Sequence, residues 1–288
     1  MRPSHPAQPY LLLAPTLILL VAFFFGPLLF ALRTSFFEWD LLTPARPVGF
    51  DNYAALLENG EFLGALGRTL GFSTLVVGGS LALGLLLALL LDRPGALAAF
   101  VRSSIFSAYV VSWVSVGLLF LFLFDRDAGL VNAMLRAVGL PSLAFLGDPS
   151  LALWTIAAVS VWKITGYALV LFLAGLKDVP DDVLEAAALD GAGPIQRFFS
   201  VTWPLLAPTT AFVATTSLIA SFQVFDVVRV MTQGGPVRST TLLVYAIFEQ
   251  IFLNLRVGRA SALSVAFFVV LLALTSLQLW VHRRRGAA

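Results

Sequence analysis

The chain has 288 residues, of which 59% are apolar and only 12% are charged. Soluble domains carry about 25% charged residues, so this composition excludes a soluble globular protein and indicates a membrane protein. The formal net charge of +2 provides no basic surface of the kind that nucleic-acid-binding proteins use. With 2 His and 0 Cys, the chain also offers few ligands for metal or thiol chemistry.

Six apolar stretches are each long enough to cross a bilayer as a helix, which takes about 20 residues. They comprise residues 11–32, 69–91, 103–124, 151–176, 205–225 and 260–281. The first stretch is too long for the apolar part of a signal peptide and lacks a cleavage site of small residues, so we interpret it as a permanent span. We therefore expect an all-α integral membrane protein with six transmembrane helices.

The even number of spans places both termini on the same side of the membrane. Counts of Lys and Arg differ little between the two sides. On the side of the termini, however, the basic residues lie in short segments close to the span ends, where they influence orientation most strongly. This distribution favours termini in the cytoplasm.

The segment 177–204, between the fourth and fifth spans, has the pattern of a helix, a turn and a second helix, and this orientation places it in the cytoplasm. Pro180 suits the first position of a helix, and acidic residues follow where the helix dipole favours negative charge. Gly191 and Gly193 predict a turn with positive φ, after which Pro194 begins the second helix. The apolar face of the first helix comprises Val183, Leu184, Ala187 and Ala188. A helix this short is marginal without a packing partner, so the pattern fits either a docking element or a solvated surface helix.

The same segment resembles the EAA signature of binding-protein-dependent ABC transporter permeases, which reads EAA, three residues, G, nine residues and I-x-L-P. The matching residues here are Glu185, Ala186, Ala187, Gly191, Val201, Trp203 and Pro204. The spacing is kept throughout, and the two departures, Val201 for Ile and Trp203 for Leu, remain apolar. A bare EAA means little in an Ala-rich chain, but the full spacing in this loop of a six-span protein is a strong signal.

Further stretches extend the resemblance over essentially the whole chain. The loop after the fifth span looks like that of the sugar-transporting branch of these permeases, on residues 225–226, 231–236, 240–241 and 258–262. Gly26-Pro27 and the segment 35–53 look like the first of the two permease subunits in the maltose, lactose and glycerol-phosphate uptake systems.

The resemblance implies a multi-pass subunit of a bacterial or archaeal cell (inner) membrane, with several partners. In this family the permease pairs with a second, similar subunit, and a coupling helix of each inserts into one of two cytoplasmic ATPase copies. An extracytoplasmic binding protein delivers the sugar. The coupling residues implied here are Glu185, Ala186, Ala187, Asp190, Gly191 and Pro204. The implied function is that of a transmembrane permease subunit in an ATP-driven sugar importer.

The chain itself contains no P-loop for ATP, because neither lysine lies in a G-x-x-x-x-G-K-[ST] pattern. We therefore expect a non-catalytic subunit that binds no cofactor, with ATP and Mg bound by the partner ATPase. The expected organisation is an N-terminal part (1–68) with the first span and the first periplasmic loop, a core permease domain (69–281) and a basic cytoplasmic tail (282–288).

Substrate contacts are suggested by polar and aromatic residues within or near the spans. Lys163 is the only charged residue inside a predicted span, where a cation costs about 3 kcal/mol and needs a partner or a water-filled cavity. Trp162 and Tyr167 beside it offer a ring face and a hydroxyl that suit a sugar, and Gln223 and Asp226 are further candidates. The alternatives are that Lys163 pairs with the sister subunit while the aromatics only pack, and that Asp226 pairs with its i+3 neighbour.

Two other features have structural interpretations. Gly78, Gly79 and Gly84 are expected to allow close approach of the second span to another helix, because small residues form most helix contacts in lipid. Asp51 and Asn52 are expected to cap a short helix in the first outward loop, which is also a possible contact for the binding protein.

The main rival is a secondary carrier driven by an ion gradient. Such carriers usually have carboxylates within their spans, and none of the six stretches contains Asp or Glu. An intramembrane enzyme is less compatible still, because neither HExxH nor GxSxG occurs.

Overall fold

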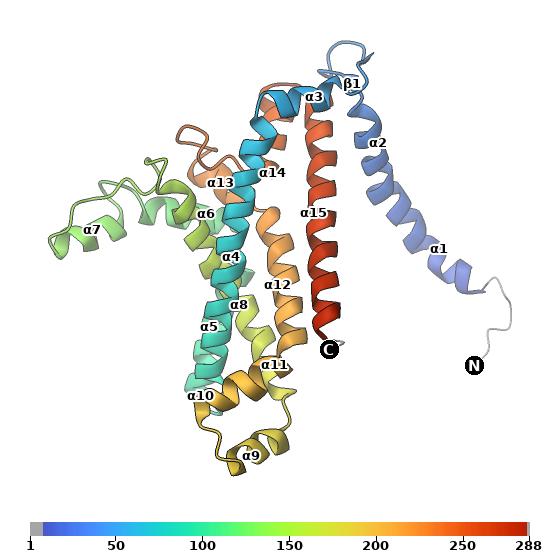
Figure 1. Cartoon of the computed structure of the whole chain (residues 1–288). Coiled ribbons are helices and arrows are strands. Elements are labelled where there is room, and N and C mark those ends of the chain that lie inside the picture. The colour runs from blue at the N-terminus through green and yellow to red at the C-terminus, as the bar shows by residue number, and fades with distance from the viewer. Residues whose placement is uncertain (1–7, 287–288) are drawn as a thin grey trace. The chain divides into compact units, whose positions relative to one another are not determined.

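The structure is a computed structural model that describes residues 8–286, with side chains over 10–280 (Figure 1). The side chains of the predicted basic tail, 282–288, lie outside these described residues. The chain is predominantly helical and divides into two compact units, the first formed by residues up to 63 together with 246–270 and the second by 64–245 together with 271 onward. Five helical segments are individually long and apolar enough to cross a membrane, and a bent pair makes up to six.

The first unit contains the N-terminal span and a small extramembrane layer. Its elements are α1 (Gln8–Leu20), the π-helical turn η1 (Val21–Phe25), α2 (Gly26–Thr34), strands β1 (Phe37–Glu38) and β2 (Arg46–Pro47), α3 (Asp51–Glu58), η3 (Glu249–Leu253) and the start of α15 (Val257–Gly286). The two strands form an antiparallel pair in which Phe37 lies opposite Pro47. The π-helical turn lies just before Pro27, which has no N–H to donate to the regular α-helical ladder.

A loop carbonyl caps the N-terminal end of α15. The carbonyl oxygen of Trp39 accepts hydrogen bonds from the backbone N–H groups of Val257 (2.9 Å) and Gly258 (3.4 Å). A Cβ on Gly258 would collide with the carbonyl oxygen of Phe37, so only glycine fits this approach. Buried Asn52 donates to the carbonyl oxygens of Ser35 and Phe37, each at 2.9 Å.

The capping role expected of Asp51 and Asn52 is wrong. The N-cap residue of α3 is Phe50, and no side chain makes a capping hydrogen bond there. Asn52 points into the protein instead, where its amide donates to the carbonyl oxygens of Ser35, the C-cap residue of α2, and Phe37 of β1.

The second unit contains the remaining elements. They are most of α4 (Glu61–Leu91), α5 (Ala96–Val110), α6 (Trp113–Leu123), α7 (Leu130–Ala137), α8 (Ala152–Lys177), α9 (Asp181–Leu189), α10 (Pro194–Arg197), η2 (Phe198–Thr202), α11 (Trp203–Leu205), α12 (Ala207–Phe222), α13 (Asp226–Met231) and the start of α14 (Leu243–Phe248). Helix α8 is the centre of this unit, since two thirds of its span are buried, and it packs against α5 and α12.

Close packing of α4 against α8 depends on two of the three glycines expected to provide it. A Cβ on Gly84 would lie 2.6 Å from the Cβ of Ala168, and one on Gly79 would lie 2.8 Å from Val161. Both positions therefore allow the helices to approach, as small residues do in membranes. Gly78 has open space where a Cβ would be, so no helix of the described chain approaches closely at that residue.

The third span is not the single helix expected over residues 103–124. Helices α5 and α6 meet at an angle of 101°, and the break falls at Val111 and Ser112, which adopt extended backbone conformations. The other five expected spans are confirmed as helices, although α4 begins at Glu61, eight residues before the expected start, and the fifth extends through a short break to Met231.

Candidate functional site

The segment 177–204 folds as a short helix, a tight turn and a second helical stretch. Helix α9 ends in a Schellman arrangement, in which Ala192 N–H donates to the carbonyl of Ala187 and Gly191 N–H to that of Ala188. Gly191 has φ +83°, which confirms the positive φ expected there. The same expectation for Gly193 is wrong, because its φ is −68° and it serves as the N-cap residue of α10.

Helix α9 is almost uncovered. Within this fully described helix no residue is buried, and only Leu184 and Ala187 are half-buried, against α10 and η2. Glu185 and Ala186 are exposed, and Leu189 is 89% exposed. Within the second unit, α9 to α11 lie together at one end of the helices, and α13 lies toward the other (Figure 1).

Lys163 is buried, and its ammonium group has partners within this chain. The Nζ atom donates to the carbonyl oxygens of Ala108 (3.1 Å), Tyr109 (2.9 Å) and Val111 at the C-terminal end of α5. It also lies 4.9 Å from the ring centre of Trp113, a cation–π distance. The last carbonyls of a helix have no partners in the helix itself, so the cation replaces a C-cap at the bend of the third span.

The aromatic residues near Lys163 lie on different surfaces. Tyr167 stacks on Tyr109, with ring centres 5.0 Å apart and planes at 22°. Trp162 makes an edge contact with Phe120 and lines a separate, mostly apolar cavity of about 610 Å³ between α4, α5 and α8.

One pocket of about 300 Å³ brings two of the expected substrate residues together. Tyr167 and Gln223 both line it, with Tyr109, Ile164, Thr216, Ser217, Ile219 and Ala220. The hydroxyl of Ser217 is buried and has no hydrogen-bond partner among the described residues. A stacked tyrosine pair, an amide and a free hydroxyl are the groups that bind sugar rings and hydroxyls. The pocket does not include Trp162, Lys163 or Asp226.

Sequence reasoning missed Tyr109, Thr216 and Ser217. A signal for Thr216 is present in the fifth span, because Thr216 and Gln223 lie seven residues apart and so place polar side chains on one helical face, and Ser217 is the next residue along the chain. Tyr109 has no such signal, because the bend of the third span places it against Tyr167.

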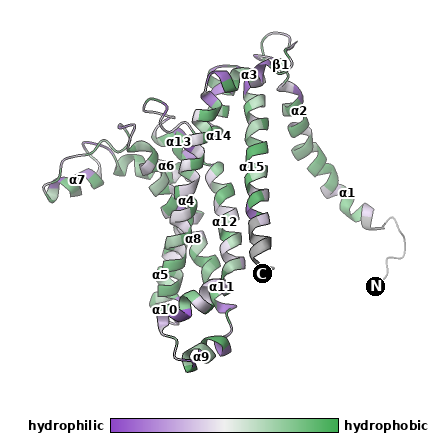
Figure 2. Cartoon of the chain, in the orientation of Figure 1, coloured by the Kyte–Doolittle hydropathy of each residue, from purple (hydrophilic) through white to green (hydrophobic). Residues whose placement is uncertain are grey.

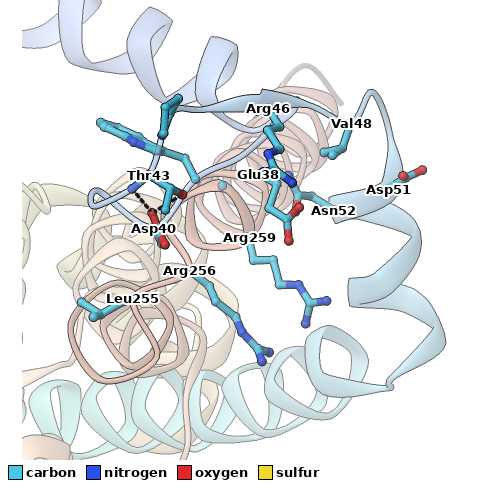
Figure 3. Close-up of a pocket in the computed structure, with 13 residues that line it drawn as sticks. Glu38, Asp40, Thr43, Arg46, Val48, Asp51, Asn52, Leu255, Arg256 and Arg259 are labelled. Carbon is cyan, nitrogen blue, oxygen red and sulfur yellow. Dashed lines mark hydrogen bonds between the residues drawn. The ribbon is translucent and has the colours of Figure 1, made fainter.

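A second, more polar pocket of about 540 Å³ lies in the first unit (Figure 3). Arg256 and Arg259 project into it side by side, and neither guanidinium group makes a hydrogen bond or ion pair with another described residue. Asp40 is held by its own loop, because its carboxylate accepts from Thr43 N–H (2.7 Å) and Thr43 Oγ1 (2.8 Å). These hydrogen bonds hold the pKa of Asp40 below its usual range.

No group of three or more His, Cys, Asp or Glu side chains that could hold a metal ion occurs among the described residues.

Comparison with known proteins identifies the family. The model of the "binding-protein-dependent transport system inner membrane component" family matches residues 80–286. The sn-glycerol-3-phosphate transport system permease protein UgpA of Agrobacterium fabrum is 37% identical over 94% of this chain and 92% of its own length. The sulfoquinovosyl glycerol transport system permease protein SmoG of the same organism is 34% identical over 96% of this chain and 90% of its own length.

A solved structure shows the same fold. A bacterial ABC transporter involved in the import of the acidic polysaccharide alginate superimposes with a TM-score of 0.83, over 96% of this chain and 94% of that one, at 24% sequence identity. The chain therefore belongs to the family of binding-protein-dependent transport system inner membrane components, as a carbohydrate-type permease subunit of a bacterial ABC importer.

Proposed function

We propose that this subunit forms part of the pathway for a sugar or a glycerol phosphate that an extracytoplasmic binding protein delivers, and that α9 couples the pathway to a cytoplasmic ATPase. The relatives support this cargo class, since their names specify sn-glycerol-3-phosphate and sulfoquinovosyl glycerol. A second, homologous permease subunit and two ATPase copies complete the importer. ATP and Mg bind to the ATPase in this scheme, and the permease chain binds no cofactor.

The proposed orientation has both termini and the segment 177–204 in the cytoplasm. The α9 end of the second unit is where α4 ends and α5 begins, and basic residues lie close to these span ends. Arg102 there donates to the carbonyl oxygen of Leu91 at the C-terminal end of α4. This local density of basic residues supports an inward-facing end.

The observation that carries the coupling proposal is the exposure of α9. No residue of this fully described helix is buried, and its two ends continue into α8 and, through α10 and α11, into α12. A partner that moves α9 therefore moves two helices that pack in the centre of the unit. The proposed contact and turn residues are Glu185, Ala186, Ala187, Asp190, Gly191 and Pro204.

The proposed substrate surface is the pocket between Tyr167 and Gln223. Tyr167 presents a ring already stacked on Tyr109, and the polar residues Gln223 and Ser217 line the same pocket. We assign Lys163 a positioning role, because three backbone carbonyls already accept from its ammonium group. Trp162 and Asp226 lie outside this pocket, so in this scheme any contact that they make with the substrate is elsewhere along the pathway.

The polar pocket of the first unit is the proposed contact for the binding protein. On the proposed orientation it faces outward, and two guanidinium groups that make no hydrogen bond or ion pair within the described chain suit acidic side chains of a docking protein.

The coupling proposal is tested with Glu185→Lys and Gly191→Pro in the transporter complex that copurifies with the tagged chain. Both variants are expected to lose substrate-stimulated ATP hydrolysis and uptake. Glu185→Lys reverses a charge on the exposed face, and Gly191→Pro forces φ away from +83° and removes the N–H that caps α9.

Gly193→Ala is the matched control, because Gly193 has an ordinary φ and open space around its Cβ position. Assembly and coupled ATP hydrolysis that remain unchanged in both test variants would contradict the coupling role of α9. Thermal-shift screening of the associated binding protein against sugars and glycerol phosphates identifies the cargo.

A further inference from the structure

Helix α7 exposes its apolar side. Five residues at spacings i, i+3, i+4, i+7 and i+8 form one stripe along it, and all of them are exposed: Leu130, Ala133, Met134, Ala137 and Val138. Met134 is 60% and Val138 72% exposed. We define these five residues as the α7 stripe. Hydropathy colouring shows α7 as mostly hydrophobic, where it extends away from α6 (Figure 2).

The side of α7 that faces the protein combines buried Asn132 with the half-buried residues Val131 and Leu135. Asn132 is fully buried, and its amide donates to the carbonyl oxygens of Asp125 (3.1 Å) and Leu143 (3.0 Å). Its side-chain oxygen accepts from Leu143 N–H at 2.8 Å. The α7 stripe is therefore an additional apolar face, and a surface helix surrounded by water would carry polar residues on its outward side instead. The hydrogen bonds of Asn132 therefore hold α7 with the α7 stripe facing outward, an orientation that is unfavourable in water.

The single basic residue of α7 is also used within the chain. Arg136 donates to the carbonyl oxygen of Asp127 (3.1 Å) and to Ser142 Oγ (3.0 Å). Its guanidinium group is thus directed at the neighbouring loop and adds to the rigidity of the segment. The α7 stripe itself contains no charged side chain.

Exposed apolar residues adjoin α7 on both sides along the chain. Leu119 and Phe122, near the end of α6, are 52% and 73% exposed, and Trp154, in the first turn of α8, is 60% exposed. These residues belong to spans, where exposed apolar side chains contact lipid and Trp marks the membrane interface. Helix α7 runs across the direction of α4 and α12 (Figure 1), the orientation of a helix that lies on a membrane surface.

We infer that α7 lies in the membrane interface, with the α7 stripe inserted at the boundary between lipid headgroups and acyl chains. Its partner is the lipid surface, and the attraction is hydrophobic, because Arg136 is already occupied by protein acceptors. The helix thereby anchors the end of α6, one arm of the bent third span, at the level of the bilayer surface.

The absence of cysteine from the sequence allows a direct test. Met134→Cys and, separately, Ala133→Cys are labelled with a nitroxide in the full chain, together with its copurifying partners, in phosphatidylcholine liposomes. The label at each position is expected to be relaxed more strongly by oxygen, which concentrates in lipid, than by a water-soluble nickel complex. Replacing a third of the lipid with phosphatidylglycerol is expected to leave this order unchanged.

Two control positions calibrate the measurement. Phe122→Cys in α6 marks lipid, and Asp127→Cys in the exposed loop before α7 marks water. The labels on α7 are expected between these two, and closer to the lipid position. A label at Met134 and Ala133 that the nickel complex relaxes as strongly as at Asp127 overturns the inference. Shielding of both labels from both reagents also overturns it and indicates a protein partner on the stripe.

Discussion

The ammonium group of Lys163 lies 2.9 Å from the carbonyl oxygen of Tyr109, which links the middle of α8 to the last turn of α5. Tyr109 in turn stacks on Tyr167, one turn beyond Lys163 on α8. The same bend of the third span thus holds a buried cation on one side and presents a stacked tyrosine pair to the pocket on the other. The lysine positions the ring that we propose as a sugar contact.

Replacing Lys163 with Met is expected to destabilise the protein. The hydrogen bond to Ala108 is buried and those to Tyr109 and Val111 are partly buried. Leaving a buried acceptor unpaired costs about 1–3 kcal/mol, so the loss is expected to reach about 3 kcal/mol. Thermal unfolding of the purified complex measures it. Lys177→Met is the control, because Lys177 is exposed in the last turn of α8. A Lys163→Met variant with normal stability and a selectively raised KM for sugar uptake would instead make Lys163 a substrate ligand.

Two glycines of α4 are expected to respond in opposite ways to alanine. Gly84→Ala is expected to destabilise the second unit by about 1–3 kcal/mol, because its Cβ would lie 2.6 Å from that of Ala168. Gly78→Ala meets open space and gains helix propensity of about 1 kcal/mol. Unfolding of the two variants in parallel measures the difference. Equal stabilities would show that α4 and α8 do not pack closely at Gly84.

The continuous helices could be predicted from sequence, but the break in the third span could not. Apolar length alone predicts 151–176, and α8 runs from Ala152 to Lys177. At Val111 and Ser112 the sequence has neither Gly nor Pro, the usual causes of a break. The carbonyls freed there are satisfied by Lys163, more than fifty residues away in the chain. A contact between residues so far apart in the chain cannot be predicted from the local sequence pattern.

The same limit applies to the pocket. Tyr167 and Gln223 were expected to contact substrate from their residue types and positions within spans, and the structure places both in one cavity. Tyr109 completes that cavity through a contact between α5 and α8, and Ser217 through burial without a partner. Neither the contact of Tyr109 nor the burial of Ser217 can be predicted from the spacing of residues in the sequence. The turn within 177–204, by contrast, could be predicted from the local sequence, because Gly191 alone accounts for the positive φ.

Substitutions in the pocket are expected to affect affinity for the substrate. Tyr167→Phe keeps the stacked ring and removes the hydroxyl, and Gln223→Ala removes an exposed amide. Each is expected to raise the KM for uptake up to about tenfold, the equivalent of one hydrogen bond of about 1.4 kcal/mol. Radiolabelled uptake into liposomes, with unstimulated ATP hydrolysis as the reference, measures this. Trp154→Phe, outside the pocket, is the control and is expected to leave KM unchanged. If Tyr167→Phe and Gln223→Ala also leave KM unchanged, the assignment of this pocket as the substrate surface is contradicted.

The loops on either side of α7 are expected to lose order in acid. Backbone N–H groups of Ala128 and Asp127 donate to the Asp125 carboxylate, and Ser150 donates to that of Asp148, which lowers the pKa of both carboxyls from 3.8. A lowered pKa in the folded state means that the stabilisation is complete above pH 3.8 and disappears as the pH falls through the lower folded value. The mobility of a label at Met134, followed from neutral pH downward, is therefore expected to stay constant to about pH 4 and then increase. In Asp125→Ala the mobility is expected to be higher already at neutral pH, and a mobility equal to that of the parent would show that the carboxylate does not order this loop.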